Sequence, residues 1–136
     1  GSLLAGAGQQ LSTGHLAFEP VESVAALEIA LSEAQAAGKP VMFDFNADWC
    51  VACKEMEKYT FPDAGVIAAL DSFTLLQADV TDNDADDKAL LQHFSSFGPP
   101  TIAFFDSAGN EQPAYKLVGY VPAEEFAAHV RRLSAL

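Results

Sequence analysis

The chain has 136 residues, half of them hydrophobic, and its 19 acidic and 7 basic side chains give a formal net charge of −12. This length fits one domain with a buried core. The surplus of negative charge argues against nucleic acid and anionic lipid as partners, because both are bound through Lys and Arg. No apolar run approaches the roughly 20 residues needed to span a bilayer, and two cysteines are too few for a disulfide-dense secreted scaffold.

The first residues are rich in Gly and small polar side chains and carry no periodic pattern. Gly1-Ser2 resembles the remnant of a cleaved tag. We predict that residues 1–19 are a tag remnant, linker or N-terminal arm and that residues 20–136 form the folded domain. The segment 15–21 favours a short edge strand at the junction.

The rest of the chain alternates between helical patterns and short apolar runs. We expect helices at 23–37, at 50–70 with a bend near Phe61-Pro62, from the acidic stretch 81–87 to Phe94, and at 122–133. We expect strands at 41–47 and 73–80, and a hairpin within 101–120 that turns at 107–110. This order predicts an α/β fold with a mixed central β-sheet flanked by helices on both faces.

The two cysteines, Cys50 and Cys53, follow the buried strand 41–47 and open the next helix. In such folds, sites form beyond the carboxyl ends of parallel strands, and the free N–H groups of a helix start stabilise a thiolate. Cysteines at i and i+3 on a first helical turn can close a disulfide, in which we expect Cys50 to face solvent and Cys53 to be shielded. The spacing therefore predicts a working redox pair.

Other uses of Cys-Val-Ala-Cys fit less well. A zinc site needs four ligands, and His15, His93 and His129 each lie in a different element. Covalent haem attachment requires His directly after the second cysteine, where this chain has Lys54. Two buried, inert thiols are the plain alternative, because Cys often packs as a small hydrophobe. We predict no metal and no cofactor beyond a redox-active disulfide.

The stretches VMFDFNADWCVACKEMEKYTF and FGPPTIAFFD resemble the thioredoxin superfamily and, within it, the C-terminal periplasmic domains of DsbD-type membrane electron transporters. The resemblance covers residues 20–135 and combines Trp-Cys-x-x-Cys, an Asp six residues before the first cysteine, and Gly-x-Pro-Thr. It implies a thioredoxin fold in which Cys50 is the nucleophile, Cys53 is the resolving thiol and Trp49 covers the site.

The resemblance also implies a function. The thiols would take electrons from the membrane domain of a parent transporter and pass them to its N-terminal domain through transient mixed disulfides. The domain would lie in the periplasm as part of a bacterial inner-membrane protein, and its electrons would serve disulfide isomerases and cytochrome c biogenesis. We expect a monomer without nucleic-acid partners or membrane insertion of its own. An independent thioredoxin-like disulfide reductase or isomerase and a redox-silent binding module are the alternatives.

Two acidic residues are candidates for the chemistry. Asp44 alternates with Phe43 and Phe45 in a buried strand, so apolar surroundings should raise its pKa toward neutrality and let it take a proton from the resolving thiol. Glu57 lies one helical turn past the second cysteine, within reach of the pair. The alternative for Glu57 is an exposed helix residue paired with a neighbouring lysine.

The same acids favour one direction of electron flow. Negative charge beside the sulfurs opposes ionisation, so we predict that the pKa of the Cys50 thiol lies above the roughly 7 typical of a thioredoxin. The Val51-Ala52 dipeptide adds no cation that would stabilise a thiolate. A destabilised thiolate favours the disulfide, and we therefore predict a reductant.

Further residues are candidates for partner contact. The resemblance assigns the family's cis-proline to Pro100, and cis bonds are nearly confined to X-Pro. Pro99 lacks the N–H that the residue before this proline offers to an extended partner, so one donor is missing. Gly119 matches a glycine whose loop approaches the site, and Trp49 forms a partner-facing wall. The plain alternatives are an ordinary Pro-Pro loop, a strand-end turn at Gly119 and a core tryptophan.

Overall fold

The computed structural model describes residues 16–136, so the predicted tag remnant and most of the predicted arm, including His15, lie outside the described residues. The strands are β2 Glu19–Pro20, β3 Val41–Asn46, β4 Thr74–Asp79, β5 Thr101–Phe105 and β6 Leu117–Val118. The helices are α1 Val24–Ala36, α2 Val51–Glu55, the π-helix η2 Met56–Thr60, α3 Ala64–Ala69, α4 Ala85–His93, the 3₁₀-helix η3 Pro113–Tyr115 and α5 Ala123–Ser134.

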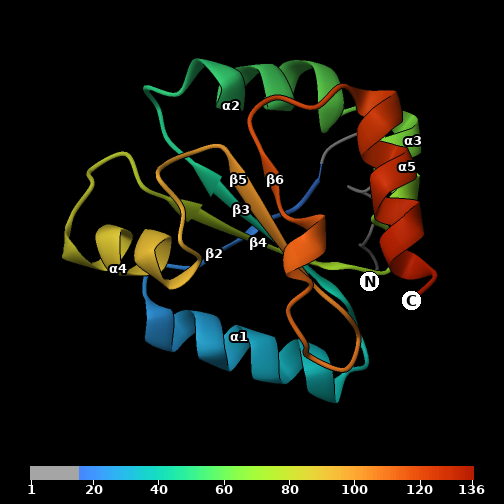
Figure 1. Ribbon diagram of the computed structural model, residues 1–136, viewed down its shortest axis with the longest axis horizontal. Helices are drawn as coiled ribbons and strands as arrows, with labels where there is room; N and C mark the ends of the chain where they lie inside the picture. Colours follow the sequence, from blue (N-terminus) through green and yellow to red (C-terminus); the bar gives the residue numbers. More distant parts are fainter. Residues whose placement is uncertain (1–15) are drawn as a thin grey trace, which may run out of the picture.

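The described strands form one mixed sheet in the order β2-β4-β3-β5-β6. Strand β4 pairs in parallel with both β2 and β3, whereas β5 is antiparallel to β3 and to β6. Helices α1 and α4 lie on one side of this sheet, and α3 and α5 lie on the other (Figure 1). The predicted α/β fold with helices on both faces is therefore confirmed.

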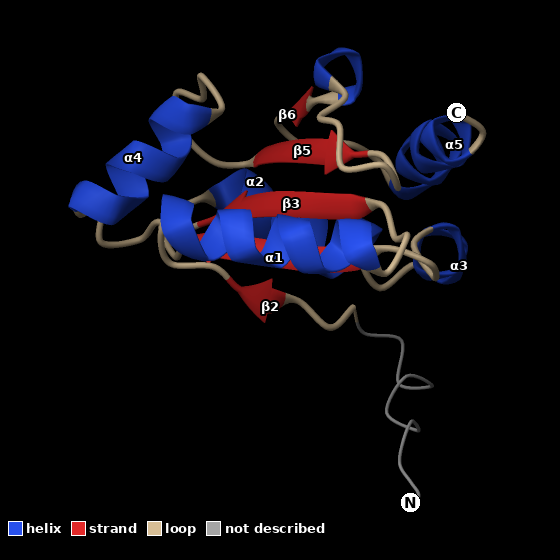
Figure 2. Ribbon diagram, turned by 90° about the horizontal axis from the view of Figure 1, so that it is seen from below, coloured by secondary structure: helices blue, strands red, loops and turns tan. Residues whose placement is uncertain are grey.

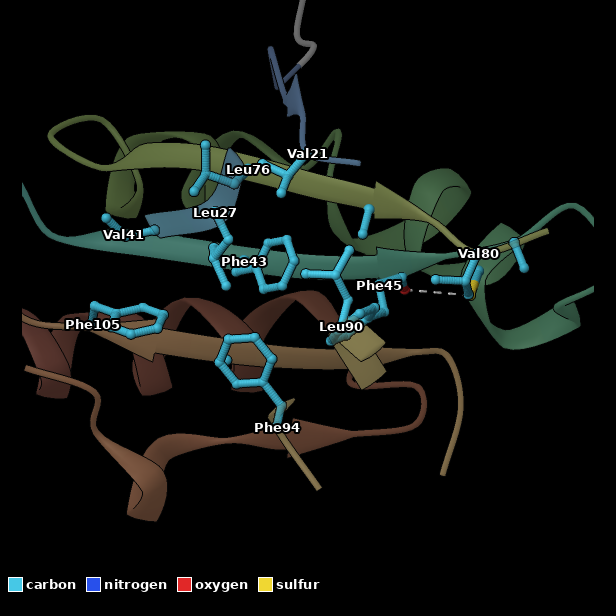
Figure 3. Packing of buried hydrophobic residues seen from close by; sticks show 14 of the residues in the cluster. Val21, Leu27, Val41, Phe43, Phe45, Leu76, Val80, Leu90, Phe94 and Phe105 are labelled. Atoms are coloured by element: carbon cyan, nitrogen blue, oxygen red, sulfur yellow. Dashed lines mark hydrogen bonds between the residues drawn. The ribbon is translucent and has the colours of Figure 1, made fainter. Parts of the chain in front are cut away.

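Each face of the sheet has its own apolar core, because successive side chains of a strand point to opposite faces. Phe43 and Phe45 of β3 pack against Phe94 at the end of α4, with ring centroids 5.3 and 5.9 Å from that of Phe94 (Figure 3). Met42, which points to the other face, belongs to the core that holds Phe126 of α5. Strand β3 is thus buried on both sides, as its almost continuously apolar run predicted.

The edges of the sheet are short strands. Strand β2 lies at one edge and β6 at the other (Figure 2). Leu16 and Phe18 pack against the core that holds Met42 and Phe126, although the sequence assigned them to an arm. The ring centroids of Phe18 and Phe61 are 5.5 Å apart. The packed structure therefore includes residues before position 20.

The acidic stretch at 81–87 starts a helix, as predicted. The Asp84 side chain accepts the N–H of Asp87 at 2.9 Å, and the Asp87 carboxyl group accepts the N–H of Asp84 at 3.1 Å. This reciprocal capping satisfies two N–H groups that a helix start leaves unpaired.

The predicted bend at Phe61-Pro62 is also confirmed, because the helical segment is broken between Thr60 and Ala64. The π-helix before it was not predicted. Two side chains of this π-helix hold the backbone of Val121: Met56 Sδ accepts its N–H at 3.4 Å, and Thr60 Oγ1 donates to its carbonyl oxygen at 2.6 Å.

The predicted hairpin is only partly correct. Its turn forms, since the Asp106 side chain accepts the N–H groups of Ala108 and Asn110, and Gly109 adopts φ +87°. Its second strand, however, is reduced to β6 and a single bridge at Glu111, with η3 between them. Pro113 opens η3, and a proline cannot donate to a strand ladder.

Candidate functional site

Cys50 and Cys53 form a disulfide at the start of α2, directly after β3. Their Cα atoms are 5.2 Å apart, and Cys50 is the N-cap residue, whose Sγ accepts the N–H of Cys53 at 3.1 Å. The Cys53 sulfur lies 3.9 Å from the carbonyl oxygen of Phe45 (Figure 3). A disulfide sulfur has no proton to donate, so this contact can become a hydrogen bond only after reduction.

The expected difference in exposure between the two cysteines is not seen. In the disulfide form, Cys50 is 6% exposed and Cys53 is 4% exposed, and both pack with Phe45 and Ala47 in the core between the sheet, α1 and α4. The prediction that Cys50 faces solvent is therefore wrong for this state. Cys50 belongs to the core that also holds Val80 and Leu90, and its N–H donates to the Ala47 carbonyl oxygen at 3.2 Å.

Asp44 is buried, with 3% of its surface exposed. The pKa of Asp44 is raised from 3.8 to about 7, chiefly because the group is buried. The hydrogen bond from Gln77 lowers this pKa, and the negative charge of Glu57 raises it. The raised pKa predicted from the alternation with Phe43 and Phe45 is present in the structure. A carboxyl group with this pKa can both accept and release a proton near neutral pH.

Glu57 lies on the π-helix rather than on a regular α-helical turn, and its side chain is exposed. Its negative charge raises the pKa of Asp44, so the two acids share one electrostatic environment. The roles predicted for Asp44 and Glu57 in the chemistry stay predictions.

Trp49 is not a core residue, because 60% of its surface is exposed. The loop after β4 holds the Trp49 segment at two points. The indole Nε1–H of Trp49 donates to the Thr81 carbonyl oxygen at 3.0 Å, and the Asp48 N–H donates to Thr81 Oγ1 at 2.9 Å. The Thr81 hydroxyl group in turn donates to Asp79. Thr81 therefore fixes the segment that precedes Cys50.

Thr81→Val should loosen this segment, because it removes the acceptor of the Asp48 N–H while keeping the size of the side chain. We expect a loss of about 1 kcal/mol in the free energy of unfolding. We also expect stronger quenching of Trp49 fluorescence by acrylamide, and Trp49 is the only tryptophan. Ser134→Ala, which removes a hydroxyl donor to Val130 on α5, is the control. Equal quenching in both variants would contradict the role of Thr81.

The Pro99–Pro100 peptide bond is cis, as the resemblance implied for Pro100. Pro100 is buried, Pro99 is half-buried, and the Gly119 N–H donates to the Pro100 carbonyl oxygen at 3.0 Å. Gly119 adopts φ +87°, which side chains other than glycine rarely allow. Thr101, which directly follows Pro100, pairs with Phe45 near the end of β3, and the disulfide comes directly after β3. The Pro99–Pro100 loop and the disulfide therefore lie at the same end of the sheet.

Exposed apolar side chains lie next in sequence to the disulfide and to the loops that contain Pro99, Pro100 and Gly119. We define the apolar rim as Trp49, Val51, Phe97 and Tyr120, of which Val51 is 74% exposed, Tyr120 is 40% exposed and Phe97 is fully exposed. Sequence reasoning identified only Trp49. The exposure of Phe97 could have been predicted from its neighbours in Ser-Ser-Phe-Gly-Pro-Pro. These residues are small or turn-forming, and a loop of this kind gives an aromatic side chain few apolar residues to pack against.

The described residues offer neither a metal centre nor a membrane-spanning helix. Within residues 16–136, no group of three or more His, Cys, Asp or Glu side chains is arranged to hold a metal ion. In the same range, no helix combines the length and the apolar character that crossing a bilayer requires.

The fold and the disulfide define a class of protein. Residues 27–134 match the thioredoxin-like domain family, and the chain belongs to it. A solved structure, the DsbD C-terminal domain of Neisseria meningitidis in the oxidised form, is 35% identical with a TM-score of 0.72, and the match covers 85% of this chain and 99% of that one. The chain belongs to the family of DsbD C-terminal domains.

Curated relatives agree with this assignment. The thiol:disulfide interchange protein DsbD of Ralstonia nicotianae is 52% identical over 132 residues, which are 97% of this chain and 22% of that protein. The DsbD of Escherichia coli K12 is 55% identical over 117 residues, which are 86% of this chain and 20% of that protein. The chain thus spans about a fifth of the length of these relatives.

Proposed function

We propose that this domain relays reducing equivalents by dithiol–disulfide exchange. It takes electrons from the membrane domain of a DsbD-type transporter and passes them to the N-terminal domain of the same protein. The observation that carries the proposal is the Cys50–Cys53 disulfide at the start of α2, directly after the strand that contains the buried acid Asp44. The similarity to DsbD proteins over nearly the whole chain does not favour an independent reductase or isomerase.

In this proposal each residue of the site has a role. Cys50 is the nucleophile, because the helix start supplies N–H donors to its sulfur, and Cys53 is the resolving thiol one turn further on. Asp44 takes the proton of Cys53 when the mixed disulfide is resolved. Glu57 adds negative charge that disfavours thiolates and keeps the pKa of Asp44 high.

Partners dock at the same end of the sheet. The apolar rim, together with Pro99, Pro100 and Gly119, forms the contact surface for transient mixed disulfides with the two other domains. The domain works as a monomer in the periplasm, attached to a bacterial inner-membrane protein. Its disulfide is the only redox group, without a metal or an organic cofactor, and its net charge of −12 argues against nucleic acid.

The reduction potential of the Cys50–Cys53 pair tests the direction of the relay. We expect a value nearer the roughly −270 mV of thioredoxin than the roughly −120 mV of the oxidant DsbA. The reason is that Asp44 and Glu57 oppose the thiolate that would stabilise the reduced form. Equilibration of the purified domain with glutathione buffers gives the potential, and a value near that of DsbA would reject a reducing relay.

Two variants show whether the acids set this potential. Glu57→Gln removes a negative charge close to the pair and should make the potential less negative. Glu55→Gln removes an equal charge from the same helical segment, from a residue to which we assign no role, and is the matched control. Equal potentials for the two variants would contradict the role of Glu57.

A further inference from the structure

The buried Asp44 carboxyl group has a specific partner on the neighbouring strand. Asp44 and Gln77 are register partners in the parallel pair β3–β4, so their side chains project from the same face of the sheet. Gln77 Nε2 donates to Asp44 Oδ2 at 2.9 Å. Within residues 16–136, this amide is the one hydrogen-bond donor to the Asp44 side chain.

Two positions beside Asp44 on this face of the sheet are apolar. Its register partner on β5 is Ile102, which is 2% exposed, and Met42 precedes it on the same face of β3. A buried carboxyl group without a hydrogen bond is strongly destabilising. The orientation of Asp44 therefore depends on Gln77, which is half-buried and borders a surface cavity of about 470 Å³.

The chemistry of an amide suits a carboxyl group that changes its charge. The amide N–H donates to a carboxylate, and after a rotation of the amide its oxygen can accept from a protonated carboxyl group. A lysine at the same position would stabilise the carboxylate through its charge, and an aliphatic residue would leave either form without a partner. Gln77 supports both states of Asp44.

We propose that Gln77 is a positioning residue of this site: it holds Asp44 Oδ2, so that the other carboxyl oxygen, Oδ1, can take the proton of Cys53. The inference rests on the proposed function, in which Asp44 is the base. In that step the Cys53 thiol gives its proton to Asp44, and the thiolate attacks the Cys50 sulfur of the mixed disulfide. The Cys50–Cys53 bond forms, the partner sulfur leaves as a thiolate, and the partner has gained the two electrons that the domain has lost.

Charged residues near Asp44 could also change its pKa. Glu57 of η2 is the one charged residue whose field raises its pKa. Helix α3 and strand β5 contain no titratable side chain, and His129 of α5 is hydrogen-bonded to the Tyr115 carbonyl oxygen at 2.7 Å. A change in the titration of Asp44 after substitution of Gln77 therefore reports on the amide.

Two substitutions of Gln77 should act in opposite directions. Gln77→Met keeps the approximate length but removes the donor, which raises the pKa of Asp44 above about 7. The rate at which Cys53 resolves a mixed disulfide should then fall about three- to tenfold at pH 7 and recover at higher pH. Gln77→Lys supplies a charged donor, which lowers the pKa and moves the pH profile of this rate to lower pH. A purely structural role would shift both variants in the same direction.

The experiment uses the whole domain and two readouts. The titration of the Asp44 carboxyl carbon is followed by NMR in the disulfide form. Resolution is followed by release of 2-nitro-5-thiobenzoate from its mixed disulfide with Cys50. Gln112→Met is the matched control, because Gln112 Nε2 also donates to a carboxyl oxygen at 2.9 Å, that of Asp106 at the opposite end of β5. It should leave both readouts at wild-type values.

The outcomes separate this inference from the proposed function. Unchanged titration of Asp44 in both Gln77 variants, or shifts in the same direction, would overturn the role of Gln77. Slow resolution in Asp44→Asn with wild-type pH profiles in both Gln77 variants would overturn this inference alone. Wild-type resolution in Asp44→Asn would overturn the proposed role of Asp44 and the inference together.

Discussion

Cys50→Ala is expected to lower the rate of disulfide reduction by about a thousandfold or more, because it removes the thiol that we propose as the nucleophile. Cys53→Ala is expected to keep the first attack but to stop after it, since no thiol remains to resolve the mixed disulfide. The two variants therefore fail in different ways, although both lose the Cys50–Cys53 bond. Reduction of insulin measures turnover, and non-reducing electrophoresis with mass spectrometry detects the trapped species.

Exposure does not decide which sulfur reacts, because the two cysteines are almost equally buried. In the proposed assignment, the position of each cysteine decides its role. Cys50 caps the helix and lies between the exposed side chains of Trp49 and Val51, whereas Cys53 lies against the Phe45 carbonyl oxygen. A mixed disulfide that accumulates on Cys53 in the Cys50→Ala variant, with Cys53→Ala still turning over, would reverse the assigned roles.

Much of the fold follows from local patterns in the sequence. The almost continuously apolar run of β3 predicted a strand buried on both faces, and the acidic start of α4 reflects the capping by Asp84 and Asp87. The elements that sequence reasoning missed depend on contacts between distant residues. The π-helix holds Val121, 61 to 65 residues away, and such a contact leaves no periodic signal.

The same distinction applies to the site. The two cysteines lie close in sequence, and the burial of Asp44 follows from its alternation with two phenylalanines. Gln77 and Thr81, by contrast, act on residues 32 to 33 positions earlier, and only the pairing of β3 with β4 brings them there. The exposure of Cys50 was predicted wrongly because Cys50 is buried in a core that includes residues distant in sequence, such as Val80 and Leu90.

Asp44→Asn is expected to stabilise the oxidised domain relative to wild type above pH 7 and to have little effect below pH 4. The pKa of Asp44 is raised from 3.8 to about 7 in the folded state, chiefly by burial. Below 3.8, the carboxyl group is protonated in both states, and its contribution to stability is fully present. As pH rises toward 7 the unfolded chain ionises first, so that contribution is lost. At 1.36 kcal/mol per pH unit, the loss approaches roughly 4 kcal/mol.

Denaturant unfolding of both proteins between pH 3.5 and 8.5 measures this effect, and the difference between them removes the pH dependence of the other acids. Asp106→Asn is the control of opposite sign, because a hydrogen bond from the Asn110 backbone holds the pKa of Asp106 below its ordinary value. The contribution of Asp106 is present above pH 3.8 and lost as pH falls, so Asp106→Asn should weaken the domain near neutral pH. If the free energies of unfolding of Asp44→Asn and wild type differed by the same amount across this range, Asp44 would ionise with an ordinary pKa. A carboxyl group that is already ionised at pH 5 would be too weak a base for the Cys53 thiol.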